Sequence, residues 1–323
     1  MNPLSEIDCP ACQHKEFDQI DSVDARALAK GYRLPHLGID ISKFLPSDLD
    51  CIDLLECRAC GLRWYWPMIP GDARFYAQLQ RIELYYQTDK PEHTYAAAQV
   101  TEGQTVLEVG CGAGAFAARL PASVIYRGLE FNDAAVHSAL ALGLDVVHQS
   151  VEQEAATRPA NFDVVCHFQV LEHVPDVVGF MKACVTALRP GGKLIVTVPA
   201  EDSFLRIAGA AWLNMPPHHV TRWTDRALTN LLASLGVETQ SVWHEPVAPF
   251  HAEWYSAVLA AHAVRRMLGG RLSLASGGLA AALAHRAGRV PALRRWLVAR
   301  GESAFPFSGR GHSVCVIGRR LPA

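Results

Sequence analysis

Three glycines and one glutamate form the clearest candidate binding site in the sequence. Gly110, Gly112 and Gly114 follow the apolar run 105–109 and precede a stretch that predicts a helix. Glycine allows a tight turn and close backbone approach to a ligand, and the free N–H groups that begin a helix face that ligand. Glu130 follows a second predicted strand, where a carboxylate can bind both hydroxyls of an adenosine ribose. The pattern predicts an adenosine-containing cofactor.

Glu108 distinguishes between two classes of such cofactor. The spacing of Gly110, Gly112 and Ala115 also satisfies the fingerprint of dinucleotide-binding proteins. A carboxylate two residues before the first glycine would repel the diphosphate of a dinucleotide, whereas it attracts the ammonium and sulfonium groups of S-adenosylmethionine. The residues therefore favour S-adenosylmethionine.

Three histidines are candidate catalytic residues: His173, His218 and His219. A sulfonium methyl group is already activated, so a protein that transfers it must mainly position the acceptor and exclude water. A hydroxyl acceptor must also lose its proton, which a neutral histidine commonly takes. We favour His218 as that base. Structural roles, such as packing by His173 or bonding of the adjacent pair to backbone carbonyls, are the alternative.

Two C-x-x-C pairs predict a structural zinc site, formed by Cys9 and Cys12 with Cys57 and Cys60. Four thiolates complete the tetrahedral coordination of zinc and leave no open position for catalysis. Cys51 could replace one of the four ligands. Reduced thiols without metal, or a redox pair, are the alternative interpretation.

The elements that must position these residues alternate in type from residue 104 onward. Near-continuously apolar strands separated by helices predict a parallel sheet that helices cover on both faces. The predicted strands are 105–109, 124–130, 144–148, 162–168, 193–198, 237–244 and 312–320.

The chain resembles the class I S-adenosylmethionine-dependent methyltransferases over roughly residues 100–245 and the final strand. Besides the glycine loop and Glu130, the matching motifs are Phe162-Asp163-Val-Val, Val170-Leu-Glu172-His173-Val174 and Leu188-Arg-Pro190-Gly191-Gly192. It is similar to ubiquinone-biosynthesis O-methyltransferases and to sugar methyltransferases preceded by a zinc module. The resemblance implies an α/β fold with a Rossmann-like, mostly parallel sheet of seven strands and a small zinc-ribbon-like module in front.

By this resemblance the glycine loop lies beside the methionine and ribose of the cofactor, and Glu130 binds the ribose. Residues 149–152 approach the adenine, and residues 167–169 lie beneath the methionine end. The implied cofactor-binding residues are Glu108, Gly110, Gly112, Gly114, Glu130, Phe131, Ser150, Val151, His167 and Phe168.

We predict four regions along the chain. They are a zinc-binding module (1–70), a helical linker (71–100), the methyltransferase domain (101–250 with 310–323) and a helical, arginine-rich insertion before the last strand (251–309). In the linker, Tyr85 and Tyr86 are interpreted as core contacts of a helix, with closure over the cofactor as the alternative.

The insertion departs from the resembled pattern, in which a short hairpin joins the last two strands. Between Glu253 and Glu302 it has eight arginines and no acidic residue. This composition predicts either peripheral contact of 254–301 with an anionic membrane or a phosphorylated acceptor, or a cap over the acceptor site. We favour the cap.

The composition limits the classes of protein to which this chain can belong. Half of the 323 residues are apolar and 19% are charged, which is typical of a packed globular protein and excludes wholesale disorder. The net charge of −2 provides no overall basic footprint for nucleic acid. Without a basic-then-apolar leader or an apolar run of about 18 residues, we predict a cytoplasmic protein.

We therefore predict an S-adenosylmethionine-dependent methyltransferase of a small molecule, and favour O-methylation of a sugar or another hydroxylated metabolite. The alternatives are C-methylation of a sugar, methylation of RNA by a protein with a zinc ribbon, and a non-catalytic partner subunit. We expect no stable complex with nucleic acid.

Overall fold

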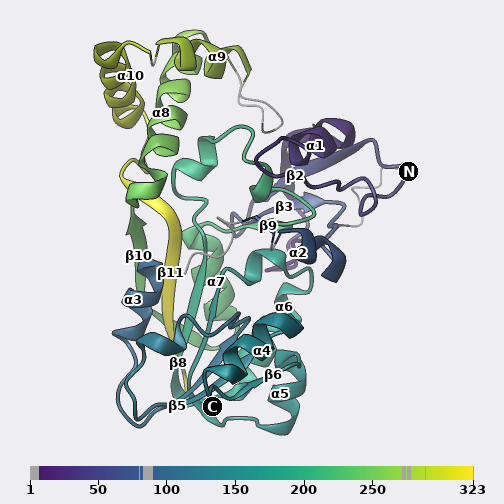
Figure 1. Ribbon diagram of the computed structural model, residues 1–323, viewed down its shortest axis with the longest axis vertical. Coiled ribbons are helices and arrows are strands. Elements are labelled where there is room, and N and C mark those ends of the chain that lie inside the picture. Colours follow the sequence, from purple (N-terminus) through teal and green to yellow (C-terminus); the bar gives the residue numbers. More distant parts are fainter. Residues whose placement is uncertain are drawn as a thin grey trace.

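The computed structural model describes residues 7–79, 81–82, 90–270, 274, 278–287 and 289–322. Tyr85 and Tyr86 of the predicted linker lie outside the described residues. Two sheets organise the chain, one of seven strands in the order β10-β11-β8-β7-β4-β5-β6 and one of four in the order β1-β2-β3-β9 (Figure 1).

The seven-stranded sheet is mostly parallel, as the sequence predicts. Its strands are β4 (Thr105–Val109), β5 (Ile125–Leu129), β6 (Val146–Val147), β7 (Phe162–Phe168), β8 (Leu188–Pro199), β10 (Val237–Pro246) and β11 (Arg310–Arg320). β4 pairs in parallel with β5 and β7, β5 with β6, and β7 with β8, whereas β11 runs antiparallel to β8 and β10. This is the predicted Rossmann-like α/β fold.

Helices cover both faces of this sheet because its strands alternate their buried side chains between two cores. Leu107 and Val165 pack with the helices on one face, and Val106 and Val164 pack with α3 on the other. The helices that flank the sheet are α3 (Pro91–Ala97), α4 (Asp133–Ala141), α5 (Val151–Thr157), α6 (Val177–Ala187) and α7 (Asp225–Ser234). The predicted two-sided covering is confirmed.

The four-stranded sheet contains a strand from a distant part of the chain. β1 (Phe17–Asp24), β2 (Cys51–Cys57) and β3 (Arg63–Trp66) come from the N-terminal region, together with α1 (Ala25–Tyr32) and α2 (Ala73–Leu79). The fourth strand, β9 (Thr221–Arg222), lies between β8 and α7 in sequence and pairs antiparallel with β3. The N-terminal region is therefore completed by residues from beyond position 70.

A buried ion-pair triad joins the two parts. Arg63 Nη1 lies 2.7 Å from Glu201 Oε1, and Arg222 Nε lies 2.8 Å from Glu201 Oε2. Each of the three side chains is at least nine-tenths buried. Because both guanidinium groups share one carboxylate, β3 and β9 are held in register where the two regions meet.

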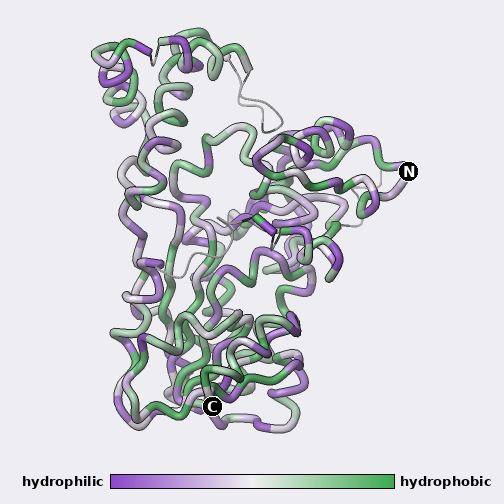
Figure 2. Tube along the Cα trace, viewed as in Figure 1, coloured by the Kyte–Doolittle hydropathy of each residue, from purple (hydrophilic) through white to green (hydrophobic). Residues whose placement is uncertain are grey.

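Three helices form the predicted insertion before the last strand: α8 (Ala252–Met267), α9 (Gly278–Ala287) and α10 (Pro291–Ser303). They pack on one another through small residues, such as Ala260 and Ala263 of α8 and Ala280 and Ala284 of α9. Figure 1 shows them at the end of the molecule away from β5 and β6. Hydrophobic and hydrophilic residues alternate along all three (Figure 2).

Among the described residues, no helix has both the length and the apolarity needed to cross a bilayer.

Candidate active site

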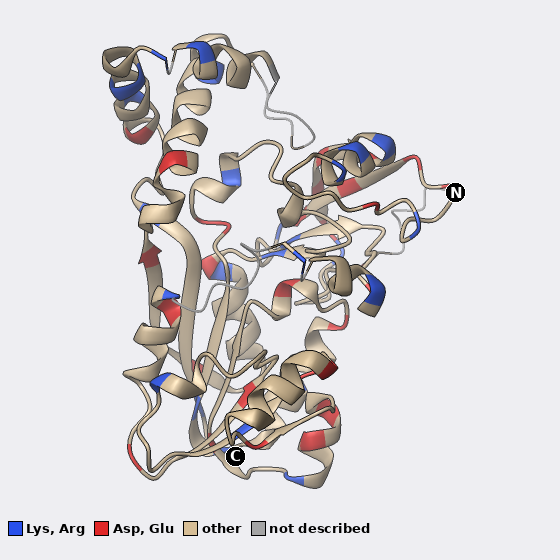
Figure 3. Cartoon of the chain, viewed as in Figure 1, with Lys and Arg blue, Asp and Glu red and all other residues tan. Residues whose placement is uncertain are grey.

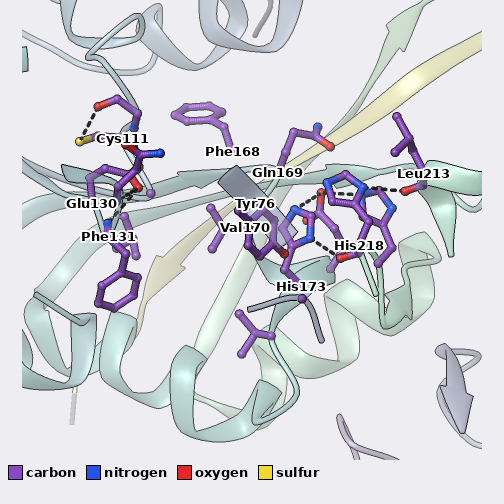
Figure 4. Close-up of a pocket in the computed structure, with 18 of the residues that line it drawn as sticks. Tyr76, Cys111, Glu130, Phe131, Phe168, Gln169, Val170, His173, Leu213 and His218 are labelled. Atoms are coloured by element: carbon purple, nitrogen blue, oxygen red, sulfur yellow. Dashed lines mark hydrogen bonds and ion pairs between the residues drawn. The ribbon is translucent and has the colours of Figure 1, made fainter. Parts of the chain in front are cut away.

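A cavity of about 1590 Å³ opens at the carboxyl ends of the parallel strands. Its walls are the glycine loop after β4, the ends of β5 and β7, the start of α5, parts of α2 and α3, and the segment 210–219. Ligands of open α/β sheets bind at this edge, where the loops diverge. Figure 4 shows Glu130 and Phe131 at one end of the cavity and His173 and His218 at the other, with Phe168 and Val170 between them.

The glycine loop needs glycine for backbone reasons. Gly110, Gly112 and Gly114 have φ values of 72°, 55° and 86°, which side-chain-bearing residues rarely adopt. A Cβ on Gly110 would lie 2.6 Å from Val170 Cγ2, and one on Gly114 would overlap Leu144. A Cβ on Gly112 would meet nothing within 4 Å. Gly110 and Gly114 therefore allow close packing, while Gly112 leaves its side of the loop open.

The segment after the glycines differs from the predicted helix. Only a 3-10 turn forms, at Ala117–Arg119. Pro121 accounts for this, because a proline disfavours helical conformation of the residue before it, and Leu120 is extended (φ −80°, ψ 152°). Instead of beginning a helix, the loop directs the backbone N–H group of Gly112 towards the Glu130 carboxylate.

Glu130 is held by backbone hydrogen bonds. The N–H of Gly112 donates to Oε2 at 2.8 Å, and the N–H groups of Phe131 and Asn132 donate to Oε1 at 2.9 and 2.8 Å. Three such bonds fix the orientation of the carboxylate at the cavity wall. The carboxylate is therefore oriented in advance to accept hydrogen bonds from the hydroxyl groups of an adjacent ligand.

Glu108 also lines the cavity but is almost completely buried, with 3% of its surface exposed. Tyr126 Oη donates a hydrogen bond to its Oε2 at 2.6 Å. Burial raises the pKa of Glu108 to about 8, against which the bond from Tyr126 acts. A cation bound beside this carboxylate would favour its ionised form.

Eight of the ten predicted cofactor-binding residues line the cavity: Glu108, Gly110, Gly112, Glu130, Phe131, Ser150, Val151 and Phe168. Ser150 also caps α5, with Gln153 completing a reciprocal capping box. Their contact with a cofactor stays a prediction.

The other two predicted positions, His167 and Gly114, do not line the cavity. The His167 side chain is completely buried and packs edge-on against Phe180, with ring centroids 5.3 Å apart. Successive strand residues point to opposite faces, so Phe168 reaches the cavity wall and His167 faces the helical layer instead. Gly114 lies behind the loop against Leu144 and shapes the turn without lining the cavity.

The three candidate catalytic histidines come together. His173 ends a 3-10 turn after β7, and His218 and His219 lie just before β9. Their ring centroids are 4.3 to 4.9 Å apart. All three line the cavity, and burial lowers the pKa of His173 to about 4 and holds the pKa values of His218 and His219 well below the usual range of histidine. The rings are therefore neutral at pH 7.

The loop that carries the histidine pair is held by the N-terminal region. Tyr32 Oη donates to the carbonyl of Met215 at 2.8 Å, and Tyr65 Oη donates to that of Asn214 at 3.0 Å. The N–H of Gly71 donates to Pro217 O at 2.6 Å. Both strands and helices of the N-terminal region thus position residues 218 and 219.

Glu172 lies beneath the histidines, with 1% of its surface exposed. No other residue in the described part of the chain donates a hydrogen bond to either of its carboxylate oxygens. Oε1 lies 3.8 Å from His173 Nε2 and 3.9 Å from His219 Nε2. Burial raises the pKa of Glu172 to about 8.

A second polar wall of the cavity was not found by sequence reasoning. Gln169 Nε2 donates to Ser313 Oγ at 3.1 Å and to Glu92 Oε1 at 3.4 Å, and Ser313 N donates to Glu245 Oε2 at 3.0 Å. Glu92 comes from α3, Glu245 from β10 and Ser313 from β11. Gln169, at φ 56°, directly follows β7. The resemblance places Gln169 beneath the methionine end of the cofactor, but no local motif marks Glu92, Glu245 and Ser313, because only the tertiary arrangement brings them together.

The four predicted cysteine ligands form one cluster. Cys9 Sγ lies 3.6 Å from Cys60 Sγ, Cys12 Sγ lies 3.5 Å from Cys57 Sγ, and all four sulfurs lie within 4.8 Å of one another. Zinc with bonds of about 2.3 Å to sulfur holds tetrahedral ligands about 3.8 Å apart, so the donor set fits zinc. The N–H group of Cys60 donates to Cys57 Sγ and the N–H group of Leu62 donates to Cys60 Sγ, each at 3.5 Å. Cys51 is not part of the cluster.

Comparison with known proteins identifies the chain's relatives. Residues 81–242 match a family model described as a methyltransferase domain. Over 198 residues the chain is 31% identical to a probable S-adenosylmethionine-dependent methyltransferase of Mycolicibacterium smegmatis, covering 60% of this chain and 70% of that protein. Over 177 residues it is 30% identical to the ubiquinone biosynthesis O-methyltransferase of Aeromonas salmonicida, covering 52% of this chain and 71% of that protein.

A solved structure supports the fold. The S-adenosylmethionine-dependent methyltransferase from Archaeoglobus fulgidus superposes with a TM-score of 0.50 at 14% identity, over 77% of this chain and 100% of that chain.

Glu108 generates a prediction for the pH dependence of cofactor binding. Below its pKa of about 8 the side chain is mostly protonated in the free protein. A cationic ligand binds the ionised form of Glu108. The affinity for S-adenosylmethionine should therefore increase with pH between pH 6 and 8, by at most about tenfold per pH unit, and should level off above pH 8. Calorimetric titration measures this dependence. Glu108→Gln should bind more weakly and lose the rise, and a wild-type affinity that stays flat over this range contradicts the assignment.

The cysteine cluster generates a second prediction. Purified protein should contain about one zinc per chain, and Cys57→Ser should lose it, as elemental analysis will show. Because the N-terminal region holds the histidine loop, this variant should lose methyl transfer while it still binds S-adenosylmethionine through the glycine loop. Cys51→Ser, outside the cluster, is the matched control and should keep both zinc and activity. A metal-free, folded and fully active wild-type protein would be the contrary result.

Proposed function

Because this chain belongs to the S-adenosylmethionine-dependent methyltransferases, we propose that it methylates a hydroxyl group of a small molecule, such as a sugar or another hydroxylated metabolite. One observation carries the proposal. A single cavity has the glycine loop with Glu130 at one end and a buried cluster of three histidines at the other (Figure 4).

We place the cofactor at the glycine-loop end. Glu130 would accept hydrogen bonds from both ribose hydroxyl groups, because three hydrogen bonds from backbone N–H groups hold its carboxylate facing the cavity. Glu108 would lie beside the ammonium and sulfonium groups, and Phe131, Ser150 and Val151 would surround the adenine. This arrangement directs the sulfonium methyl towards the histidine end.

The polar wall supports a hydroxylated acceptor. Gln169, Glu92, Glu245 and Ser313 supply several hydrogen-bond donors and acceptors beside the histidine cluster. Burial and the neighbouring Glu92 raise the pKa of Glu245 to about 7, so its carboxyl group can donate as well as accept near neutral pH. Such a surface suits a ligand with several hydroxyl groups.

We assign activation of the acceptor to the histidine cluster. In-line transfer requires the acceptor oxygen to approach the methyl carbon opposite the sulfur, and bond formation expels the cofactor as its thioether. The imidazoles are neutral, which is the form that can interact with a hydroxyl proton. However, burial also opposes formation of an imidazolium, so His218 acting alone as a base would be disfavoured.

Two variants separate cofactor binding from acceptor activation. Glu130→Ala should weaken S-adenosylmethionine binding at least about tenfold, because it removes the ribose contact. His218→Ala should retain cofactor binding but slow turnover about 100-fold or more. Mass spectrometry of a panel of nucleotide-linked sugars, phenolic metabolites and RNA, with purified protein and labelled cofactor, measures transfer. His137→Ala, on the exposed face of α4, is the control. Normal turnover by His218→Ala, or transfer to RNA alone, contradicts the proposal.

The sequence favours a cap over the acceptor site, but apolar residues exposed on α9 and α10 lead us to propose peripheral contact of the insertion with an anionic membrane. On α9, Leu279 and Leu283 are exposed, and on α10, Leu293 and Trp296 are exposed. Helical spacing places Arg286 beside the first pair and Arg300 beside the second, with the Arg300 guanidinium 5.4 Å from the Trp296 ring centroid. Figure 3 shows basic residues gathered along these two helices. Exposed apolar groups beside arginines suit the interface of an anionic bilayer, and of these arginines Arg294 also lies 3.9 Å from Glu253 Oε1 through its Nη1.

Vesicle sedimentation tests this contact. The protein should pellet with phosphatidylserine-containing vesicles and remain in solution with pure phosphatidylcholine. Arg294→Ala combined with Arg295→Ala should weaken binding about 30-fold, since each basic residue near such a surface contributes about 1 kcal/mol. Arg158→Ala combined with Arg189→Ala, on the other side of the chain, should bind as the wild type does. Equal binding to both vesicle types would remove the proposal.

A further inference from the structure

We propose that Glu172, His173, His218 and His219 bind a divalent transition-metal ion at the acceptor end of the cavity. This site is separate from the cysteine cluster and is built from residues on two different segments of the chain. The inference rests on the proposed function, because it specifies how the acceptor hydroxyl is activated.

The hydrogen bonds of the histidines fix their tautomers. Nδ1 of His173 lies 2.6 Å from the carbonyl of His218, Nδ1 of His218 lies 2.7 Å from that of Leu213, and Nδ1 of His219 lies 2.9 Å from Asn214 Oδ1. An oxygen of this kind only accepts, so each Nδ1 carries the proton and donates it. In a neutral ring the lone pair then lies on Nε2. A bond from the distal ring nitrogen to an oxygen is the usual support of a metal-binding histidine.

Glu172 is the second, independent observation. Glu172 is 1% exposed, and neither carboxylate oxygen accepts a hydrogen bond from another residue that the structure describes. A buried polar group without a partner is destabilising, and more so when it is ionised. Oε1 lies 3.8 Å from His173 Nε2 and 3.9 Å from His219 Nε2, which is too far for direct hydrogen bonds. A cation between these three atoms would satisfy the carboxylate and both imidazoles.

The distances suit an ion with short bonds to nitrogen and oxygen. Metal–ligand bonds of about 2.0–2.2 Å separate neighbouring donor atoms by about 3–4 Å. One ring nitrogen from each of the three histidines can be chosen so that all three lie within 4.8 Å of one another. Imidazole nitrogens together with a carboxylate suit zinc and other first-row transition metals, whereas magnesium prefers oxygen ligands.

The scaffold holds these ligands before any ion binds. Val220 N donates to the carbonyl of Glu172 at 2.9 Å, which ties the segment after β7 to the histidine loop. The N-terminal region fixes the same loop from the other side through Tyr32 and Tyr65. Rigid support of this kind is what a binding site needs to keep its ligands in place.

A metal ion here would replace the unfavourable imidazole base. The acceptor hydroxyl binds the ion through oxygen and releases its proton to solvent, because the positive charge stabilises the oxyanion. An electron pair of that oxygen forms the new bond to the methyl carbon. The bond from this carbon to sulfur breaks, and its electron pair remains on sulfur. The oxidation state of the ion does not change.

Cobalt titration tests the site in the full-length protein with its cysteine cluster loaded with zinc. We expect about one Co²⁺ to bind per chain in addition to zinc. The absorption spectrum of the bound Co²⁺ should lack the near-ultraviolet thiolate-to-cobalt band that a cysteine site produces. Binding of Co²⁺ with that band, or no binding beyond the cysteine cluster, overturns the inference.

Two ligand variants and one control locate the ion. Glu172→Gln keeps the shape of the side chain and removes a buried charge, so it should fold. Both it and His219→Ala should weaken Co²⁺ binding at least about tenfold, as loss of a metal ligand requires. His251→Ala, elsewhere on the cavity wall, should bind Co²⁺ as the wild type does. S-adenosylmethionine binding by each variant checks that it is folded, and unchanged Co²⁺ affinity in both ligand variants would overturn the assignment.

Activity separates failure of the ion site from failure of the proposed function. If methyl transfer runs at its full rate in chelator-dialysed protein that retains only the cysteine-bound zinc, the ion has no role and the proposed function stands. If Co²⁺ binds as expected but no hydroxyl acceptor in the panel is methylated, the ion site stands and the proposed acceptor class is wrong. Loss of transfer on dialysis and its return with added Co²⁺ or Zn²⁺ support both.

Discussion

The carboxylate of Glu201 binds two guanidinium groups in the interior, and the arrangement of the site depends on this contact. Arg63 belongs to β3 and Arg222 to β9, so one buried acidic group joins the N-terminal sheet to the segment after β8. Removing one partner of a buried ion pair is destabilising by about 3–5 kcal/mol, because the remaining charge is uncompensated. The two parts of the chain are therefore constrained to meet in one register, where Arg63 opposes Arg222.

That register determines where the histidines lie. His218 and His219 come directly before β9, and the carbonyls of this loop accept hydrogen bonds from Tyr32 and Tyr65 of the N-terminal region. The cysteine cluster organises the turn that leads into β3. The N-terminal region thus acts on the cavity through β3, which pairs with β9 directly after the histidine loop.

The buried carboxyl groups of the cavity wall favour positively charged ligands. Burial raises the pKa of Glu108 and of Glu172 to about 8 and that of Glu245 to about 7. A carboxylate in such surroundings becomes more favourable when a cation lies beside it. We propose that the sulfonium cofactor supplies that charge at one end, and we infer a metal ion at the other end. The same physical principle therefore explains both ends of the cavity.

The sequence by itself determined the features that depend on neighbouring residues. The glycine loop, Glu130, the alternation of strands and helices and the two cysteine pairs follow local rules of backbone conformation, spacing and donor chemistry, and they predicted the fold class, the family and the cysteine cluster. Only the tertiary structure decided which side chains face the cavity. It turned His167 into the core, brought Glu92, Glu245 and Ser313 to one wall, and placed unpartnered Glu172 beneath the histidines. The physical reason is that burial and pairing depend on how distant strands are ordered, which no local pattern encodes.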